Sequence, residues 1–222
     1  MFYEPRRGDH GLPHDPFKAL VVPRPIGWIG TVSGDGTPNL APYSYFNAVA
    51  DRPPMVMFSS QGRKDSLRNV EETGEFTWSL ATLALRDAMN LSSAPVDASV
   101  DEIALAGLTH RPSRLVAAPS VAESPASFEC RLWRVIDLPE DPAHPDVAGH
   151  VVLGEVVGVH LDETVLRDGL VDAGSLQPLS RLGYMDYGVL TPETTFTMSR
   201  PTASDDGLSA DVDPAPWDGV YR

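Results

Sequence analysis

The sequence predicts a mainly β protein in which an antiparallel sheet closes on itself, with short helices inserted between the strands. Strand-like segments follow one another along most of the chain, and the strongest turn signal, Asp35-Gly36, joins two of them as a hairpin. The helical segments are few and short, so the strand–helix alternation of a Rossmann fold is not expected. Closing an antiparallel sheet removes its exposed edges, which favours a barrel.

The first third of the chain predicts one short helix and three strands. Asp15-Pro16 is typical of a helix start, and Pro23 ends that helix. β-branched and aromatic residues on both sides of Asp35-Gly36 predict paired strands, and another strand follows the turn-forming segment 51–54. The predicted elements are a helix over 15–21 and strands over 26–33, 37–46 and 55–60.

The rest of the chain predicts three short helices, three strands and one long surface loop. The helices cover 65–74, 82–90 and 99–106, the strands 75–80, 127–138 and 150–161, and the loop 107–127. In the strand over 127–138, alternation predicts Phe128, Cys130 and Leu132 on one buried face and Glu129 on the other face. The strand over 150–161 is nearly continuous in valine, which predicts burial on both faces.

Length and charge limit the classes of function. The chain has 222 residues with 42% hydrophobic content, enough for one packed domain, which we expect over 1–200. The acidic Pro/Ser-rich tail over 201–222 is expected to be flexible or held on a neighbouring surface by Trp217 and Tyr221. The formal net charge of -14 argues against a nucleic-acid partner, because it repels phosphate backbones. No segment resembles a membrane helix or a signal peptide, so we expect a soluble cytoplasmic protein without membrane contact.

Several common catalytic motifs are absent from the sequence. Gly34 and Gly36 begin a spacing like GxGxxG, but Pro38 interrupts it and Asn39 replaces the last glycine, so a hairpin turn explains them better. There is no Walker-type loop and no GxSxG elbow, and the six histidines lie too far apart in sequence to predict a metal site. The single cysteine, Cys130, is expected to be a buried apolar thiol rather than a nucleophile.

One polar block, Gln61-Gly62-Arg63-Lys64-Asp65-Ser66, lies between a predicted strand and a predicted helix. Free backbone N–H groups at a helix N-terminus attract anions. Lys64 adds a positive charge there, and Ser66 adds a hydroxyl donor. The block is therefore a candidate anion site, although taken alone it is explained better by a solvated turn with an ordinary helix cap.

A succession of short motifs surrounds this block. They are RPIGWI (24–29), NLAPYSYFNAV (39–49), DRPPMVMFSS (51–60), KDSLRN (64–69), ETGEF (72–76), AMN (88–90), SAP (93–95), ECR (129–131) and GEVV (154–157). As a set, the motifs resemble the flavin reductase-like family, and the resemblance extends over about residues 1–190. It implies an FMN-binding split antiparallel β-barrel of Greek-key type.

The resemblance also implies which residues hold the cofactor. The expected FMN-binding residues are Thr31, Ser44, Tyr45, Phe46, Asn47, Ser59, Ser60, Lys64, Asp65 and Ser66. The segment 44–47 is expected along the flavin ring, with main-chain groups and the side chains of Ser44 and Asn47 at its polar edge. The strand end at 59–60 and the turn at 64–66 are expected at ribityl and phosphate oxygens, and Thr31 near the ring. Ser66 stands where threonine is more usual in the family, which keeps the hydroxyl.

The implied function is a flavin reductase-like oxidoreductase that transfers a hydride from NADH or NADPH to flavin. A small barrel has little interior room, so FMN is expected in a groove between the two subunits of a homodimer. No side chain is expected to be an obligatory catalyst, because the cofactor carries the reactivity. His160 is the candidate nicotinamide contact, since Gly154 and Gly158 leave room for a planar ligand; a strand-end histidine bonded to backbone or water is the alternative.

Two other functions stay open at this point. One is a non-enzymatic FMN protein that carries electrons or stores flavin. The other is a pyridoxamine phosphate oxidase-like enzyme, which would need a basic pocket for a second phosphate; the candidate clusters for it are Arg63-Lys64 and Arg111 to Arg114. The sequence does not specify the electron donor, the final acceptor or a partner oxygenase that would consume reduced flavin.

Overall fold

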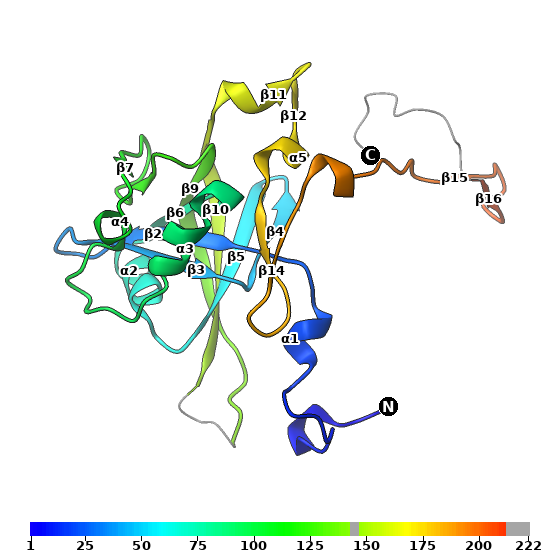
Figure 1. Ribbon diagram of the computed structural model, residues 1–222, viewed down its shortest axis with the longest axis horizontal. Coiled ribbons are helices and arrows are strands. Elements are labelled where there is room, and N and C mark those ends of the chain that lie inside the picture. The colour runs from blue at the N-terminus through cyan, green and yellow to red at the C-terminus, as the bar shows by residue number, and fades with distance from the viewer. Residues whose placement is uncertain (143–146, 212–222) are drawn as a thin grey trace.

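The computed structural model describes residues 1–142 and 147–211 (Figure 1). Trp217 and Tyr221, the expected tail anchors, lie outside the described residues. Seven antiparallel strands form one sheet in the order β3-β2-β6-β9-β10-β5-β4. They are β2 (Gly27–Val32), β3 (Pro38–Tyr43), β4 (Phe46–Asp51), β5 (Pro54–Gln61), β6 (Glu75–Ser79), β9 (Ala126–Asp137) and β10 (Gly149–Leu161).

Side-chain packing curls this sheet around a hydrophobic core. Strand β3 lies at one edge of the sheet and β5 lies next to the other edge, yet the rings of Tyr43 and Phe58 are only 4.9 Å apart. Phe58 also contacts Phe76 of β6, at 5.5 Å. On β4, Phe46 stacks on Trp78 with ring centroids 5.5 Å apart. The edge strands β3 and β4 do not pair with each other, and both contribute rings to one core, so the barrel is split between them.

Short helices cover one end and the outer side of the sheet. Helix α2 (Asp65–Thr73) places Leu67 and Val70 in the barrel core. Helices α3 (Arg86–Leu91) and α4 (Glu102–Leu105) contribute Met89 and Ile103 to a second core cluster, on the other face of β2 and β3. Within the described ranges, no helix combines the length and the apolar character needed to cross a bilayer.

The remaining elements are small. Three strands pair as β1-β13-β14, and three two-stranded ribbons join β7 with β8, β11 with β12 and β15 with β16. Their bounds are β1 (Arg24–Pro25), β7 (His110–Arg111), β8 (Ser120–Val121), β11 (Leu166–Arg167), β12 (Leu170–Val171), β13 (Leu179–Arg181), β14 (Tyr187–Val189), β15 (Thr202–Ala203) and β16 (Ala210–Asp211). The other helices are α1 (Phe17–Leu20) and α5 (Ala173–Leu176).

The predicted mainly β fold is confirmed, with differences at element boundaries. The predicted strand over 37–46 ends at Tyr43, and a separate strand, β4, begins at Phe46. Between them the chain bends, and the Tyr45 carbonyl accepts a hydrogen bond from the Ser59 N–H at 2.8 Å. The predicted helix over 82–90 is a short 3-10 turn followed by α3, and the loop over 107–127 contains β7 and β8.

Burial differs from the sequence pattern at two places. Glu129 lies on the face opposite Cys130, yet it is only 1% exposed, because the segment carrying Arg114 and Leu115 folds over it. Strand β10 was expected to be buried on both faces, but Val159 is 63% exposed. Strand β5 pairs with β10 only as far as Glu155, so the last part of β10 has no neighbour on that side.

The prediction of a buried thiol at Cys130 is confirmed, since the residue has no exposed surface. Burial raises the pKa of this thiol, so the reactive thiolate is suppressed in the folded chain. We expect a chromogenic thiol reagent to leave the native protein unmodified and to titrate one thiol after denaturation. Rapid reaction of the native protein would contradict the packing of β9.

Candidate functional site

Three segments that the sequence singled out meet at one end of the barrel. They are the bend at Ser44-Tyr45, the end of β5 and the turn that leads into α2. The bend is joined to β5 by the bond from the Ser59 N–H to the Tyr45 carbonyl. The turn is joined to β5 by the Ser60 hydroxyl, which donates to the Gly62 carbonyl at 2.8 Å. Gly62 has φ +78°, a left-handed conformation that favours glycine.

The N-terminus of α2 opens toward solvent at this turn. Lys64 is the N-cap residue, with an extended backbone, and no side chain caps the first turn. The carboxylate of Asp65 pairs with Arg68 instead of capping the helix. Arg63 pairs with Glu71 one turn further along, whereas the Lys64 side chain is exposed. The first-turn N–H groups and Lys64 therefore present positive potential to an approaching anion.

A layer of buried polar side chains supports the turn from beneath. The side-chain amide of Asn39 donates to Thr31 Oγ1 at 3.2 Å and to Ser66 Oγ at 3.0 Å. The amide of Asn69 donates to the same Thr31 oxygen at 3.1 Å. Thr31, Ser60 and Ser66 are at most 1% exposed, and their hydroxyls bond within this layer and the turn. Direct flavin contacts from these three residues stay a prediction.

Two buried polar atoms of this layer have no hydrogen-bond partner among the described residues, Asn69 Oδ1 and the Tyr43 hydroxyl. The Tyr43 hydroxyl is enclosed and makes no hydrogen bond. Burial raises the pKa of this phenol, and the neighbouring hydroxyls of Ser66 and Ser60 counteract the rise only in part. The Tyr43 hydroxyl lies beneath the turn and can both donate and accept a hydrogen bond. Tyr43 was not among the predicted site residues, because a motif does not show whether a tyrosine hydroxyl finds a hydrogen-bond partner.

The other predicted contacts differ in accessibility. Asn47 and Lys64 are exposed, and Ser44, Tyr45, Ser59 and Asp65 are half-buried. The Phe46 ring is stacked on Trp78 in the core, so a ligand at the bend can reach only the main chain of Phe46. Asn47 Oδ1 accepts from the Ala48 N–H at 2.9 Å, which fixes the amide at the start of β4.

The structure does not bring His160 to this set within one chain. The β5–β10 register places His150 opposite Ser60, and His160 pairs with Ser127 at the far end of β10. The separation along the strand is about 30 Å. The histidine beside the candidate site is therefore His150, which is buried and bonds Asp137 through Nδ1 at 2.7 Å. Only the register of two long strands identifies it, and that register is not readable from the sequence.

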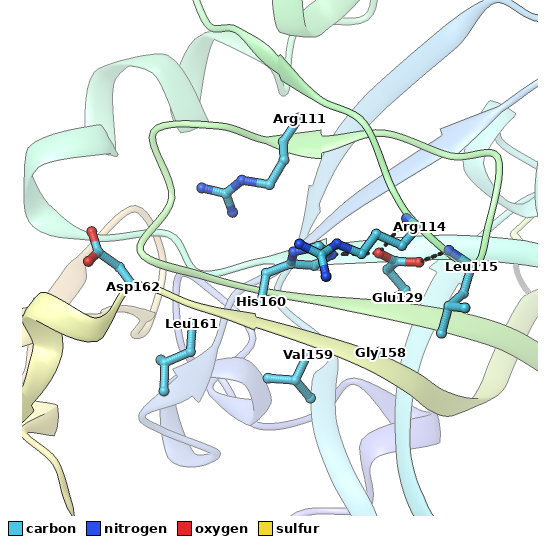
Figure 2. A pocket seen from close by; sticks show the side chains of 9 residues that line it. All are labelled: Arg111, Arg114, Leu115, Glu129, Gly158, Val159, His160, Leu161 and Asp162. Carbon is cyan, nitrogen blue, oxygen red and sulfur yellow. Dashed lines mark hydrogen bonds and ion pairs between the residues drawn. The ribbon is translucent and has the colours of Figure 1, made fainter. Parts of the chain in front are cut away.

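His160 instead forms one wall of a pocket of about 540 Å³ (Figure 2). Its Nε2 lies 2.5 Å from Glu129 Oε1, and Figure 2 shows Arg111 and Arg114 on the same side of β10. The Glu129 carboxylate also accepts the backbone N–H groups of Arg114 at 2.8 Å and Leu115 at 2.6 Å. The alternative for His160 was a strand-end histidine bonded to backbone or water, whereas the bond that the structure shows is to the Glu129 carboxylate.

Comparison with known proteins gives matches over most of the chain. The model of the flavin reductase like domain matches residues 19–180. A curated relative, an uncharacterised protein of Aquifex aeolicus, is 37% identical over 174 residues, which cover 76% of this chain and 85% of that protein. Within residues 1–142 and 147–211, no three His, Cys, Asp or Glu side chains are grouped so as to hold a metal ion.

Solved structures give the same result. Nitrilotriacetate monooxygenase component B from Bacillus cereus superposes with a TM-score of 0.79 at 32% identity, covering 88% of this chain and 98% of that chain. Flavoredoxin of Desulfovibrio vulgaris gives 0.69 at 25% identity, covering 81% and 91%. A Shewanella frigidimarina protein described as having a split barrel domain gives 0.70 at 21% identity, covering 85% and 90%, and supports the fold alone. With its curled, split sheet and a family match over residues 19–180, the chain belongs to the flavin reductase like domain family and has the split-barrel fold.

Proposed function

We propose that the chain binds FMN, with the phosphate at the N-terminus of α2, and works as an NAD(P)H-dependent flavin oxidoreductase. The observation that carries the proposal is the uncapped first turn of α2, with Lys64 exposed beside it and the unpartnered Tyr43 hydroxyl beneath it. A phosphate dianion suits free N–H groups and an ammonium group. The family match and the similarity to flavoredoxin support flavin as the ligand.

The ring of the flavin is proposed to lie along the bend before β4. Ser44, Asn47 and Ser59 are accessible there and offer hydroxyl and amide groups to a polar ring edge. Bound FMN would supply the hydride-accepting chemistry. The residues of this chain orient the ring and leave one of its faces open for a nicotinamide, so we expect no side chain to be obligatory for hydride transfer.

We also propose a homodimer with the flavin between its subunits. The chain has an accessible surface of 13,950 Å² and a mass of 24.0 kDa. A compact monomer of that mass exposes about 9,900 Å². Part of the excess belongs to the exposed arms at both ends, and part to apolar residues such as Val49 and Val159, which are 49% and 63% exposed. Exposed apolar residues of this kind are suited to a subunit interface.

If each flavin touches both subunits, dissociation of the dimer should release flavin, because cofactor and partner then stabilise the same state. We expect the loaded protein to sediment as a dimer at micromolar concentration and to lose absorbance of bound flavin as dilution produces monomer. Absorbance-detected sedimentation at flavin and protein wavelengths measures both quantities together. A monomer that keeps its flavin at high dilution would contradict the shared site.

His160 remains the proposed nicotinamide contact, and its distance from Ser60 requires that it act across the subunit interface. His160→Ala should weaken NAD(P)H binding while FMN stays bound and dithionite reduces it at the normal rate. Because His160 also bonds Glu129, His160→Gln is the control that keeps a side-chain donor in that place. Stopped-flow reduction decides the role: a collapsed limiting rate at saturating donor would show that the imidazole takes part in the chemistry.

The main test of the oxidoreductase proposal is anaerobic mixing of the flavin-loaded protein with NADH and with NADPH. Bleaching of the flavin at a rate that saturates with donor concentration supports the proposal. Bound flavin that only dithionite bleaches would favour the electron-carrier function, which the similarity to flavoredoxin supports as the second candidate. The similarity to nitrilotriacetate monooxygenase component B supports a partner oxygenase that uses the reduced flavin. The cytoplasmic location stays a prediction.

A further inference from the structure

The C-terminal part of the chain leaves the barrel as an extended arm. Figure 1 shows the segment that follows α5 and the strand β14 running outward to the β15–β16 hairpin. Its root is fixed: a Cβ added at Gly174 of α5 would lie 2.9 Å from the Pro192 nitrogen. The family match ends at residue 180, so the arm lies beyond the shared domain. We call residues 194–204 the strap.

The strap has an alternating pattern that normally belongs to a half-buried strand. Phe196 and Met198 are two residues apart, and Thr195 and Thr197 alternate with them. In an extended chain, residues two apart face the same way. Yet Phe196 is 82% exposed and Met198 is 80% exposed, so the described part of the chain covers little of either side chain.

The N-terminal arm shows what an anchored arm looks like in this molecule. The buried guanidinium of Arg24 donates to the carbonyls of Val21 at 2.5 Å and Leu182 at 2.8 Å, and it also bonds the Lys18 carbonyl. These bonds hold the N-terminal arm against the turn between β13 and β14. Phe196 and Met198 of the strap, by contrast, stay largely exposed within residues 1–142 and 147–211.

Charge indicates what covers the strap. Arg200 is the only charged residue between positions 194 and 204, so the strap carries one positive charge in a chain whose net charge is -14. Because a second copy of the chain is also negatively charged, it attracts this positive segment more than it attracts the acidic parts of the arm. Each copy also exposes apolar side chains on its long strands, including Trp133 at 59% and Val159 at 63%.

We propose that the strap lies across the second copy of the chain in the homodimer, with Phe196 and Met198 packed on that copy's apolar surface. The inference rests on the proposed homodimer and adds a specific contact to it. By two-fold symmetry each subunit both gives and receives a strap. The contact lies outside the proposed flavin residues, so it ties the subunits together without taking part in hydride transfer.

The first experiment measures dimer dissociation by sedimentation equilibrium of the full chain. The double variant Phe196→Ser and Met198→Ser should raise the dimer dissociation constant at least tenfold while thermal unfolding of the barrel stays unchanged, because both residues are exposed within their own chain. Leu105→Ser is the matched control, since Leu105 is an exposed apolar residue of α4, on the side of the barrel away from the arm (Figure 1). That variant should dimerise like the parent.

The second experiment places photoreactive benzoylphenylalanine at position 196 in place of Phe196 and irradiates the dilute protein. A covalent dimer on a denaturing gel supports the strap, and the same probe at position 105 should give none. A chain that sediments as a dimer, is insensitive to the double variant and yields only monomer-mass products would overturn the strap while the homodimer stands. A chain that sediments as a monomer would overturn both the homodimer and the strap.

Discussion

Replacing Glu129 by Ala is expected to lower the free energy of unfolding by about 2–5 kcal/mol, because each buried donor left without its acceptor costs about 1–3 kcal/mol. The carboxylate is enclosed and accepts from the Arg114 and Leu115 N–H groups and from His160 Nε2. Alanine leaves the two backbone N–H groups and His160 Nε2 without this acceptor. Chemical denaturation followed by tryptophan fluorescence measures the loss.

The pH dependence gives a second measure of the same carboxylate. Burial alone would raise the pKa of Glu129, but bonds from the Arg114 N–H, His160 and the Leu115 N–H together hold this pKa below its ordinary value. The stabilisation is therefore present above the unfolded pKa of about 4.3, and it is lost as the pH falls through that value toward the folded pKa. Glu129→Gln, which cannot ionise, should lack this loss.

Glu155→Ala is the matched control, because Glu155 is an exposed glutamate on the adjacent strand β10. Its unfolding free energy should stay within about 0.5 kcal/mol of the parent. If Glu129→Ala were as stable as Glu155→Ala, the carboxylate would not be holding the 111–118 segment in place.

Lys64→Ala is expected to weaken FMN binding roughly tenfold to 150-fold, since one charge-assisted contact to an ion is worth about 1.5–3 kcal/mol. The variant should fold normally, because Lys64 is exposed and caps α2 through its backbone only. Fluorescence titration of FMN at fixed ionic strength measures the change.

Arg63→Ala provides the control for charge alone. It removes a cation from the same turn, but the Arg63 guanidinium is paired with Glu71. We therefore expect a much smaller loss of FMN affinity from this variant. Equal losses from the two variants would reduce the role of Lys64 to general electrostatic attraction, and an unchanged affinity in Lys64→Ala would remove it from the site.

The fold was largely predictable because its strands carry strong local signals. The Asp35-Gly36 turn and the alternation around Cys130 depend on neighbouring residues only, and both predictions agree with the structure. The division of 37–46 into β3 and β4 depends on a bond between Tyr45 and Ser59, which are distant in sequence. The burial of Glu129 depends likewise on a loop that crosses its strand, which periodicity cannot reveal.

The candidate site was predictable as a set of segments but not as a set of contacts. The motifs identified the bend at Ser44, the end of β5 and the turn at Lys64, and the structure brings these together. Which hydroxyls face outward follows from packing, so Ser60 and Ser66 were not distinguished from the accessible Ser59. The unsatisfied Tyr43 and the position of His150 opposite Ser60 required coordinates.

The central claim is that the α2 N-terminus holds the phosphate of FMN, and comparison of FMN with riboflavin tests it most directly because the two differ only in that group. Titration of the full-length protein should show FMN binding at least tenfold more tightly than riboflavin, as expected if one charge-assisted contact is worth about 1.5 kcal/mol or more. In Lys64→Ala the two affinities should approach each other, with riboflavin binding unchanged. Equal affinity of the unmodified chain for FMN and riboflavin, or no affinity for either, would contradict the account.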